Sequence, residues 1–337
     1  MAENKKLSIM ITAYNLSSYI EETLDSVLRQ QTNFEYEILV GDDGSSDDTQ
    51  KIVESYVKKY PDTIKLFVMD RDNNVKYDKI ERASKNRINL LEHANGEYLI
   101  FLDGDDKYID DNKLQKQVEV LDNPVNSDCV ACSHNCWVFW NEQHKKLINT
   151  ATNIRKISSY DYWKYGMYFH SDTIMFRNIF KGKYPDYLPN DDYDDNIIAF
   201  ILLKYGKIIY LPDAMVYYRQ VDNSSWNSVN KVEKSIINLL DWPVENSILE
   251  SFSRASVYRH LADILYVRMH YEEIDESMLD KYKNKLDKYK KSKAVDWIEY
   301  GNKSITRKFY MNMWLGWHLF LFIFVKITKM LPKYKVN

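Results

Sequence analysis

Cysteine is scarce in this chain of 337 residues, which contains three cysteines, nine glycines and seven prolines. Cys129, Cys132 and Cys136 leave one thiol unpaired under any pairing, so they do not form the disulfide framework of a small secreted domain. Their spacing, with His134 between them, leaves a zinc site as an alternative. Because the segment alternates like a strand, we expect free thiols that pack as small buried hydrophobic groups.

A strong charge of one sign is also lacking. The 46 basic and 49 acidic residues nearly balance, and the tyrosines are spread along the chain without a basic patch. We therefore expect no nucleic-acid partner. Residues 1–6 are polar and charged, so we also expect no secretory signal peptide at this end.

Apolar segments with two different periods alternate over the first hundred residues. This alternation predicts βαβ units and a Rossmann-like, mainly parallel sheet with flanking helices. Ligands of such sheets bind beyond the carboxyl ends of the strands, and polar or acidic residues follow three of these strands. Strands are predicted at residues 7–15, 37–40, 64–68 and 98–102, and helices at residues 19–30, 49–60 and 86–94.

The apolar run at residues 98–102 ends abruptly in three carboxylates, Asp103, Asp105 and Asp106, with one glycine among them. A buried strand that stops at such a cluster brings oxygen ligands to one point at the edge of a sheet. Hard cations such as Mg²⁺ or Mn²⁺ prefer these ligands, and a nucleotide diphosphate requires such a cation. The alternative is an acidic turn without a ligand.

Four motifs occur in order along the first part of the chain: Thr12-Ala13-Tyr14-Asn15, Val40-Gly41-Asp42-Asp43-Gly44-Ser45, Gly96-Glu97-Tyr98 and Phe101-Leu102-Asp103-Gly104-Asp105-Asp106. Together they resemble the family 2 glycosyltransferases, over roughly the first 225 residues. The resemblance implies the A-type nucleotide-sugar-binding fold, an inverting reaction and a nucleotide-sugar donor.

The resemblance also implies roles for single residues at the donor. Thr12, Tyr14 and Asp43 would hold the nucleobase and ribose, because a carboxylate accepts the imide N–H of uracil and an aromatic ring covers a base. The alternative role for Asp43 is turn formation and helix capping. Asp103 would contact ribose or a metal-bound water. Asp105 or Asp106, or both together, would bind Mn²⁺ or Mg²⁺.

Basic residues are expected at the diphosphate. Lys85 and Arg87 occupy the place where the family often carries Ala-Arg-Asn, and their alternative role is a solvated helix face. Arg219 either contacts phosphate or pairs with an acid at the edge of the core. Many relatives have a histidine two residues after this arginine, but this chain has Val221 there.

A second acidic cluster, residues 190–196, precedes a predicted helix at residues 197–205. Acidic residues suit the start of a helix, yet four carboxylates exceed what a cap requires. The family has an acidic pair at this point that contains the general base. The pair falls on Asp194 and Asp195, so Asp195 is the expected base, with Asp192 as the next candidate. One base without an enzyme nucleophile predicts a single displacement with inversion.

Strand signals nearly vanish beyond residue 227, which predicts a helical appendage. A run of seventeen uncharged residues, 309–325, lies in a stretch that has seven basic and no acidic residues from Lys303 onward. As a helix this run spans roughly 25 Å, at about 1.5 Å per residue, whereas a bilayer core needs about 30 Å. The run therefore favours insertion into one leaflet of an anionic cytoplasmic surface, with a buried or dimer helix as alternatives.

These observations predict three parts: a donor-binding domain at residues 1–226, a helical appendage at 227–306 and a membrane-associating tail at 307–337. The expected function is metal-dependent hexosyl or N-acetylhexosaminyl transfer from a uridine diphosphate sugar to a hydroxyl of a glycan or lipid-linked glycan. Such a reaction belongs to the synthesis of bacterial surface polysaccharides. The alternatives are a non-catalytic sugar-nucleotide or glycan-binding module and a sugar nucleotidyltransferase. The latter would require a glycine-rich phosphate loop, which residues 12–15 do not form.

Overall fold

The computed structural model describes residues 5–72, 79–165, 169–185, 193, 195–220, 229–249 and 253–327. Its contacts divide the chain into two compact units, which we describe separately. The first unit comprises residues 1–158 and 167–221, and the second comprises residues 159–166 and 222–337. The predicted boundaries at residues 226 and 306 remain a prediction.

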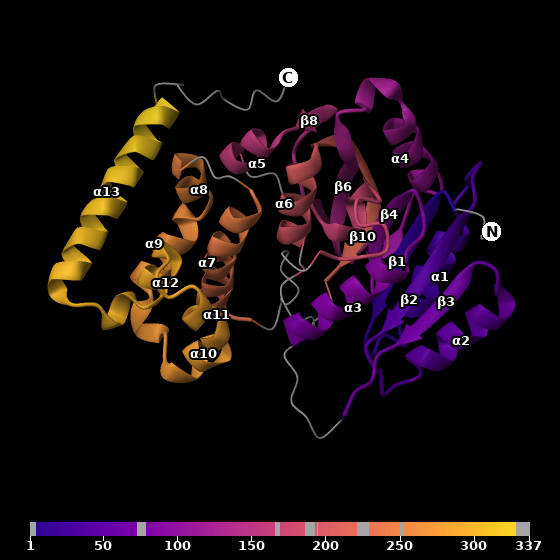
Figure 1. Cartoon of the computed structure of the whole chain (residues 1–337), viewed down its shortest axis with the longest axis horizontal. Helices are drawn as coiled ribbons and strands as arrows, with labels where there is room; N and C mark the ends of the chain where they lie inside the picture. The colour runs from indigo at the N-terminus through magenta and orange to yellow at the C-terminus, as the bar shows by residue number, and fades with distance from the viewer. Residues whose placement is uncertain are drawn as a thin grey trace. The chain divides into compact units, whose positions relative to one another are not determined.

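A ten-stranded mixed sheet forms the centre of the first unit (Figure 1). Its main path has the order β3-β2-β1-β4-β9-β6-β10-β5, and β7 and β8 pair with β6 and β10. The strands β1 to β4 are parallel, as predicted, and β9 joins β4 and β6 in antiparallel pairing. The strands are β1 (Leu7–Ala13), β2 (Tyr36–Asp42), β3 (Ile64–Val68), β4 (Tyr98–Asp103), β5 (Lys107–Tyr108), β6 (Cys129–Asn141), β7 (His144–Leu147), β8 (Arg155–Ile157), β9 (Met175–Arg177) and β10 (Lys207–Arg219).

Burial on both faces explains why β1, β2 and β4 are almost continuously apolar. Because the chain reverses its direction across the sheet after β3, right-handed connections place α3 on the face opposite α1 and α2. The three cysteines are free thiols within buried β6, as predicted. The helices of this unit are α1 (Ile20–Leu28), α2 (Thr49–Lys59), α3 (Lys79–His93), α4 (Lys113–Asp122) and α6 (Asp195–Tyr205).

The second unit is helical, as predicted for the appendage, and has its own apolar core. It also includes α5, which precedes the predicted boundary. The part of the chain that the structure describes has no helix long and apolar enough to cross a membrane. The helices are α5 (Ser159–Tyr165), α7 (Lys231–Ile248), α8 (Ser253–Arg259), α9 (Leu261–Met269), α10 (Glu276–Lys281), α11 (Lys283–Lys288), α12 (Lys293–Ile298) and α13 (Ile305–Ile327).

A buried ion network crosses the core of this second unit. The Glu245 carboxylate on α7 lies 3.1 Å from Nε of Arg259 and 2.7 Å from Nε2 of His260. Burial alone would raise the pKa of Glu245, but His260 and Arg259 lower it below its ordinary value of 4.5. Its stabilisation is therefore complete above that ordinary value and is lost as the pH falls through the lower folded-state pKa.

We expect Glu245→Ala to reduce the free energy of unfolding by about 3–5 kcal/mol, because it leaves the Arg259 and His260 side chains buried without their shared carboxylate. Urea unfolding at pH 7 measures this loss. Glu276→Ala, at an exposed position of α10, is the matched control. Equal midpoints for the two variants would contradict the structural role of the network.

Candidate functional site

The carboxyl ends of three neighbouring strands form the candidate site. In the register of the sheet, Thr12 at the end of β1 lies opposite Gly41 of β2 and opposite Asp103 of β4. The polar residues that follow these strands therefore meet at one edge of the sheet, as the sequence pattern predicts.

Asp103 is held in its ionised form at the centre of this edge. Its carboxylate accepts hydrogen bonds from Oγ1 of Thr12 at 2.8 Å and from Nη2 of Arg87 at 3.0 Å. Burial raises the pKa of Asp103, but the charges of Arg87 and His170 and these hydrogen bonds bring it below the usual range. Arg87 also donates to the backbone oxygen of Tyr193 at 3.3 Å, so it links β4 to the start of α6.

The loop after β4 is fixed by its backbone. A Cβ at Gly104 would lie 2.7 Å from the backbone oxygen of Thr12, so only glycine permits this close approach. Oγ1 of Thr23 lies 2.8 Å from the backbone oxygen of Gly104 and 2.7 Å from that of Asp106, so its one hydroxyl proton is shared between these two acceptors. The following carboxylates are thereby held in place.

Arg219, the last residue of β10, closes the other side of this loop. Its backbone N–H donates to Oδ1 of Asp106 at 2.7 Å, and its guanidinium donates to the backbone oxygen of Asp105 at 2.6 Å. The guanidinium also pairs with Glu22. Of the two roles expected for Arg219, the structure therefore contains the ion pair with an acid.

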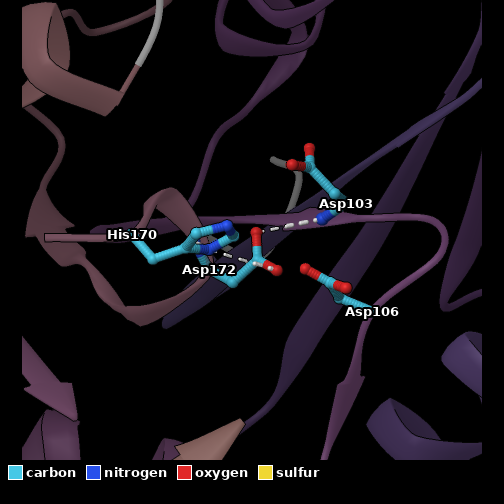
Figure 2. Close-up of side chains that lie close together, drawn as sticks. All are labelled: Asp103, Asp106, His170 and Asp172. Atoms are coloured by element: carbon cyan, nitrogen blue, oxygen red, sulfur yellow. Dashed lines mark hydrogen bonds and ion pairs between the residues drawn. The ribbon is translucent and has the colours of Figure 1, made fainter. Parts of the chain in front are cut away.

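Asp106 lies in a buried group with two residues of a distant turn. Asp103, Asp106, His170 and Asp172 each place one potential ligand atom within 4.8 Å of the others, and this group does not include Asp105 (Figure 2). Figure 2 shows Asp172 between the imidazole of His170 and the carboxylate of Asp106. Oδ2 of Asp106 and Oδ2 of Asp172 are buried without a hydrogen-bond partner.

The electrostatics of this group and of neighbouring Asp105 are unfavourable for several negative charges at once. Burial raises the pKa of Asp105 to about 6, and the charge of Asp103 adds to this shift. Burial also raises the pKa of Asp172 to about 6, although His170 opposes the shift, and burial and Asp172 raise that of Asp106. A cation bound at this edge would relieve the repulsion.

The nucleotide end of the site contains two acids with different partners. Asp42 accepts hydrogen bonds from the backbone N–H and the hydroxyl of Ser45, so it shapes the turn after β2. The Asp43 carboxylate instead forms ion pairs with Arg71, at 2.6 Å, and with Arg82. The guanidinium of Arg71 lies 4.1 Å from the ring centre of Tyr14, whose side chain is 41% exposed.

The base candidate Asp195 begins α6 at the same edge of the sheet. Its charge is among those that raise the pKa of Arg87 and of His170, in each case against the effect of burial. Asp195 therefore lies near the groups that surround Asp103. Asp192 and Asp194 lie outside the described residues.

A family model described as "Glycosyl transferase family 2" matches residues 8–182, which include every described residue of this edge up to Asp172. The chain belongs to glycosyl transferase family 2. The family membership that the four motifs indicated is confirmed.

Relatives and solved structures agree with this membership. Rv1520 of Mycobacterium tuberculosis is 28% identical over 228 residues, which are 66% of this chain and 61% of that protein. TuaG of Bacillus subtilis, a putative teichuronic acid biosynthesis glycosyltransferase, is 36% identical over 115 residues, 34% of this chain and 41% of TuaG. The chain thus matches less than two thirds of the length of either relative.

The structure of Staphylococcus aureus TarS 1-349 in complex with UDP-GlcNAc is similar to the structure of this chain, with a TM-score of 0.57 at 18% sequence identity. The match covers 87% of this chain and 81% of the TarS chain. The mixed sheet with its flanking helices therefore has the A-type glycosyltransferase fold, as expected.

The structure brings several of the predicted site residues together, whereas Lys85 lies apart from them. Thr12, Arg87, Asp103 and Asp195 lie around one edge of the sheet, and Asp105 and Asp106 lie in the adjoining loop. Lys85 is 55% exposed on α3 and pairs with Glu81 one turn earlier, which is the solvated face considered as its alternative.

Sequence reasoning missed Arg71, Arg82 and Asp172. The basic residues that follow β3 were a signal for the first two, because the chain after β3 must pass the same sheet edge. The signal for Asp172 was a carboxylate directly after His170-Ser171 within a largely apolar segment.

Proposed function

We propose that this chain is an inverting glycosyltransferase that moves a sugar from a uridine diphosphate donor to a hydroxyl of a glycan. The observation that carries the proposal is the convergence of Asp43, Asp103, Asp105 and Asp195 at one edge of an A-type sheet. Such an edge offers separate groups for the base, the ribose, the diphosphate and the acceptor.

Tyr14 and Asp43 would hold the nucleobase. The partly exposed ring of Tyr14 offers an apolar face for uracil, and the Asp43 carboxylate accepts its imide N–H. Arg71 contacts both groups and fixes their relative positions. Thr12 and Asp103, already joined by a hydrogen bond, would contact the ribose.

Asp105 would hold Mn²⁺ or Mg²⁺ at the diphosphate, with Asp106 as the other candidate. The residues fit a cation, because burial and the charge of Asp103 raise the pKa of Asp105 to about 6 and outweigh its backbone hydrogen bond and the charge of His170. A bound divalent ion supplies neutralisation of the charge that develops on the leaving diphosphate. Arg87 adds a fixed positive charge beside Asp103.

Asp195 would act as the general base. It would accept the proton of the acceptor hydroxyl as that oxygen attacks the anomeric carbon from the face opposite the diphosphate. With one base and no enzyme nucleophile, the displacement is single and the configuration inverts. Asp192 and Asp194 are the other candidates for this role.

A hexose or an N-acetylhexosamine is the proposed sugar, and a surface polysaccharide is the proposed product. The name of TuaG, in teichuronic acid biosynthesis, and the UDP-GlcNAc bound to TarS support these choices. A lipid-linked acceptor at the cytoplasmic face of the membrane would explain the apolar tail. The alternatives are the binding module and the nucleotidyltransferase considered above.

A screen of nucleotide sugars tests the function directly. We expect hydrolysis of one uridine diphosphate sugar, dependent on Mn²⁺ or Mg²⁺ and faster with a glycan acceptor. Binding of the donor without any turnover would support the non-catalytic module instead. Pyrophosphate release from a nucleoside triphosphate and a sugar phosphate would support the nucleotidyltransferase.

Helix α13 carries the proposed membrane contact. Met311 and Leu315 are buried on one side, whereas a stripe of large apolar side chains is 57–88% exposed on the other. Such a face suits the interface of a bilayer, and the basic residues of this segment suit anionic headgroups. The stripe consists of Ile305, Phe309, Met313, Trp317 and Phe320.

We expect the triple change Phe309→Ser, Met313→Ser and Trp317→Ser to abolish flotation of the full chain with anionic liposomes. Each of these side chains contributes about 1.5–3 kcal/mol when fully buried in an apolar phase. Val125→Ser with Ile154→Ser, at exposed apolar positions of the first unit, is the control. If the triple variant floats like the unchanged chain, α13 does not hold the protein on membranes.

A further inference from the structure

We propose that Asp106, His170 and Asp172 form a second divalent-cation site, buried beneath the donor site and independent of Asp105. Their ligand atoms, with one of Asp103, lie within 4.8 Å of one another. Asp106, Asp172 and His170 are 1%, 0% and 3% exposed. One cation can therefore contact several of these groups at once, out of reach of bulk solvent.

Two buried carboxylate oxygens in this site have no hydrogen-bond donor. Oδ1 of Asp106 accepts the N–H of Arg219 and Oδ1 of Asp172 accepts the N–H of Asp103, whereas Oδ2 of each has no hydrogen-bond partner. Oδ2 of Asp172 lies 3.6 Å from Nδ1 of His170, another member of the site. A buried carboxylate oxygen without a partner is costly. A cation between the two carboxylates, which face each other in Figure 2, satisfies both oxygens.

The turn that carries His170 and Asp172 is fixed in advance of binding. Gln117 on α4 donates to the backbone oxygen of Thr173 at 2.9 Å, and Oγ1 of Thr173 lies 2.8 Å from the hydroxyl of Ser133 on β6. Oγ1 of Thr173 also donates to the backbone oxygen of His170 at 2.7 Å. Such supporting contacts orient ligands in metal sites.

The ligand set selects the kind of cation. Carboxylates alone suit Mg²⁺ and Ca²⁺, whereas an imidazole favours transition-metal ions. A site of three carboxylates and one imidazole therefore fits Mn²⁺ better than Mg²⁺.

Binding of Mn²⁺ to the full chain without nucleotide tests this site. We expect one ion per chain by calorimetry and electron paramagnetic resonance, tighter than Mg²⁺ or Ca²⁺. His170→Gln and Asp172→Asn should each weaken it by about tenfold or more, since even changes to supporting contacts cost 10–100-fold. His144→Gln, at an exposed histidine on β7, should leave it unchanged.

The melting temperature of Asp172→Asn shows whether this variant still folds. The amide oxygen keeps the contact with Asp103, and the amide N–H₂ donates to Oδ2 of Asp106 in place of two opposed carboxylates. We therefore expect this variant to fold without metal and to lose the increase in melting temperature that Mn²⁺ causes in the unchanged chain. An increase with Mn²⁺ in this variant equal to that of the unchanged chain would refute the site.

Asp105→Asn separates this site from the donor metal. We expect nucleotide-free Mn²⁺ binding to persist in this variant. If Asp105→Asn abolishes it, or if the unchanged chain binds no Mn²⁺ without nucleotide, the buried site is refuted and the proposed transferase still stands. No turnover enters this measurement, so a failure of the proposed function would not affect its outcome.

Discussion

Asp195→Asn is expected to lower the rate of sugar transfer by about 10²–10⁴-fold, the usual contribution of a general base, while donor binding stays intact. An amide has nearly the shape of a carboxylate but cannot take the proton of the acceptor hydroxyl. The place of Asp195 at the start of α6, with its charge acting on Arg87 and His170, supports this role.

Two measurements separate a lost base from a lost site. Calorimetry of uridine diphosphate with Mn²⁺ should give the same affinity for Asp195→Asn and the unchanged chain. Release of uridine diphosphate measures transfer to the acceptor. In this assay the kcat of Asp195→Asn should fall, whereas its KM for the donor should change much less. Transfer within a few-fold of the unchanged chain would move the role to Asp192 or Asp194.

Much of the sheet was predictable because its central strands are buried on both faces. The largely apolar runs that form β1, β2 and β4 can be recognised from local sequence alone, and polar or acidic residues follow each of them. Strand β9 was not predicted, because its three residues become a strand only by pairing with β4 and β6. Such pairing depends on contacts that local sequence does not encode.

The candidate site divides in the same way. Thr12 and Asp103 were predictable because both directly end a strand and the register places them side by side. The choice between Lys85 and its neighbours depends on the phase of α3, which begins at Lys79, seven residues before the predicted start. In that phase Asn86 donates to the backbone oxygen of Gly41 and Arg87 reaches Asp103, whereas Lys85 is exposed.

His170 and Asp172 were the least predictable residues, because their position depends on distant parts of the chain. The turn that carries them is held by Gln117 of α4 and Ser133 of β6, which lie 56 and 40 residues from Thr173. No local period marks such a turn. Only the folded sheet brings it beneath the loop after β4.

Asp105→Ala is expected to abolish metal-dependent binding of uridine diphosphate while the fold survives. The carboxylate of Asp105 lies on a loop whose backbone is fixed by Thr23, Gly104 and Arg219, so loss of this side chain removes a ligand without releasing the loop. Burial already raises the pKa of Asp105 to about 6, which means that the folded chain without a cation disfavours this charge. Removing it should therefore raise stability slightly at neutral pH, where the folded state otherwise pays for an ionised group.

The test combines affinity, stability and pH. Calorimetry of uridine diphosphate should show an Mn²⁺-dependent increase in affinity for the unchanged chain and none for Asp105→Ala. Because a cation competes with the proton on Asp105, the unchanged chain should gain this affinity as the pH rises through about 6 and the carboxyl ionises. Asp110→Ala, in the same connection to α4 but outside the site, is the control and should keep the full Mn²⁺ effect. Equal Mn²⁺-dependent affinity in Asp105→Ala would exclude Asp105 from the metal and leave Asp103, which Arg87 keeps ionised, as the acid that meets the diphosphate cation.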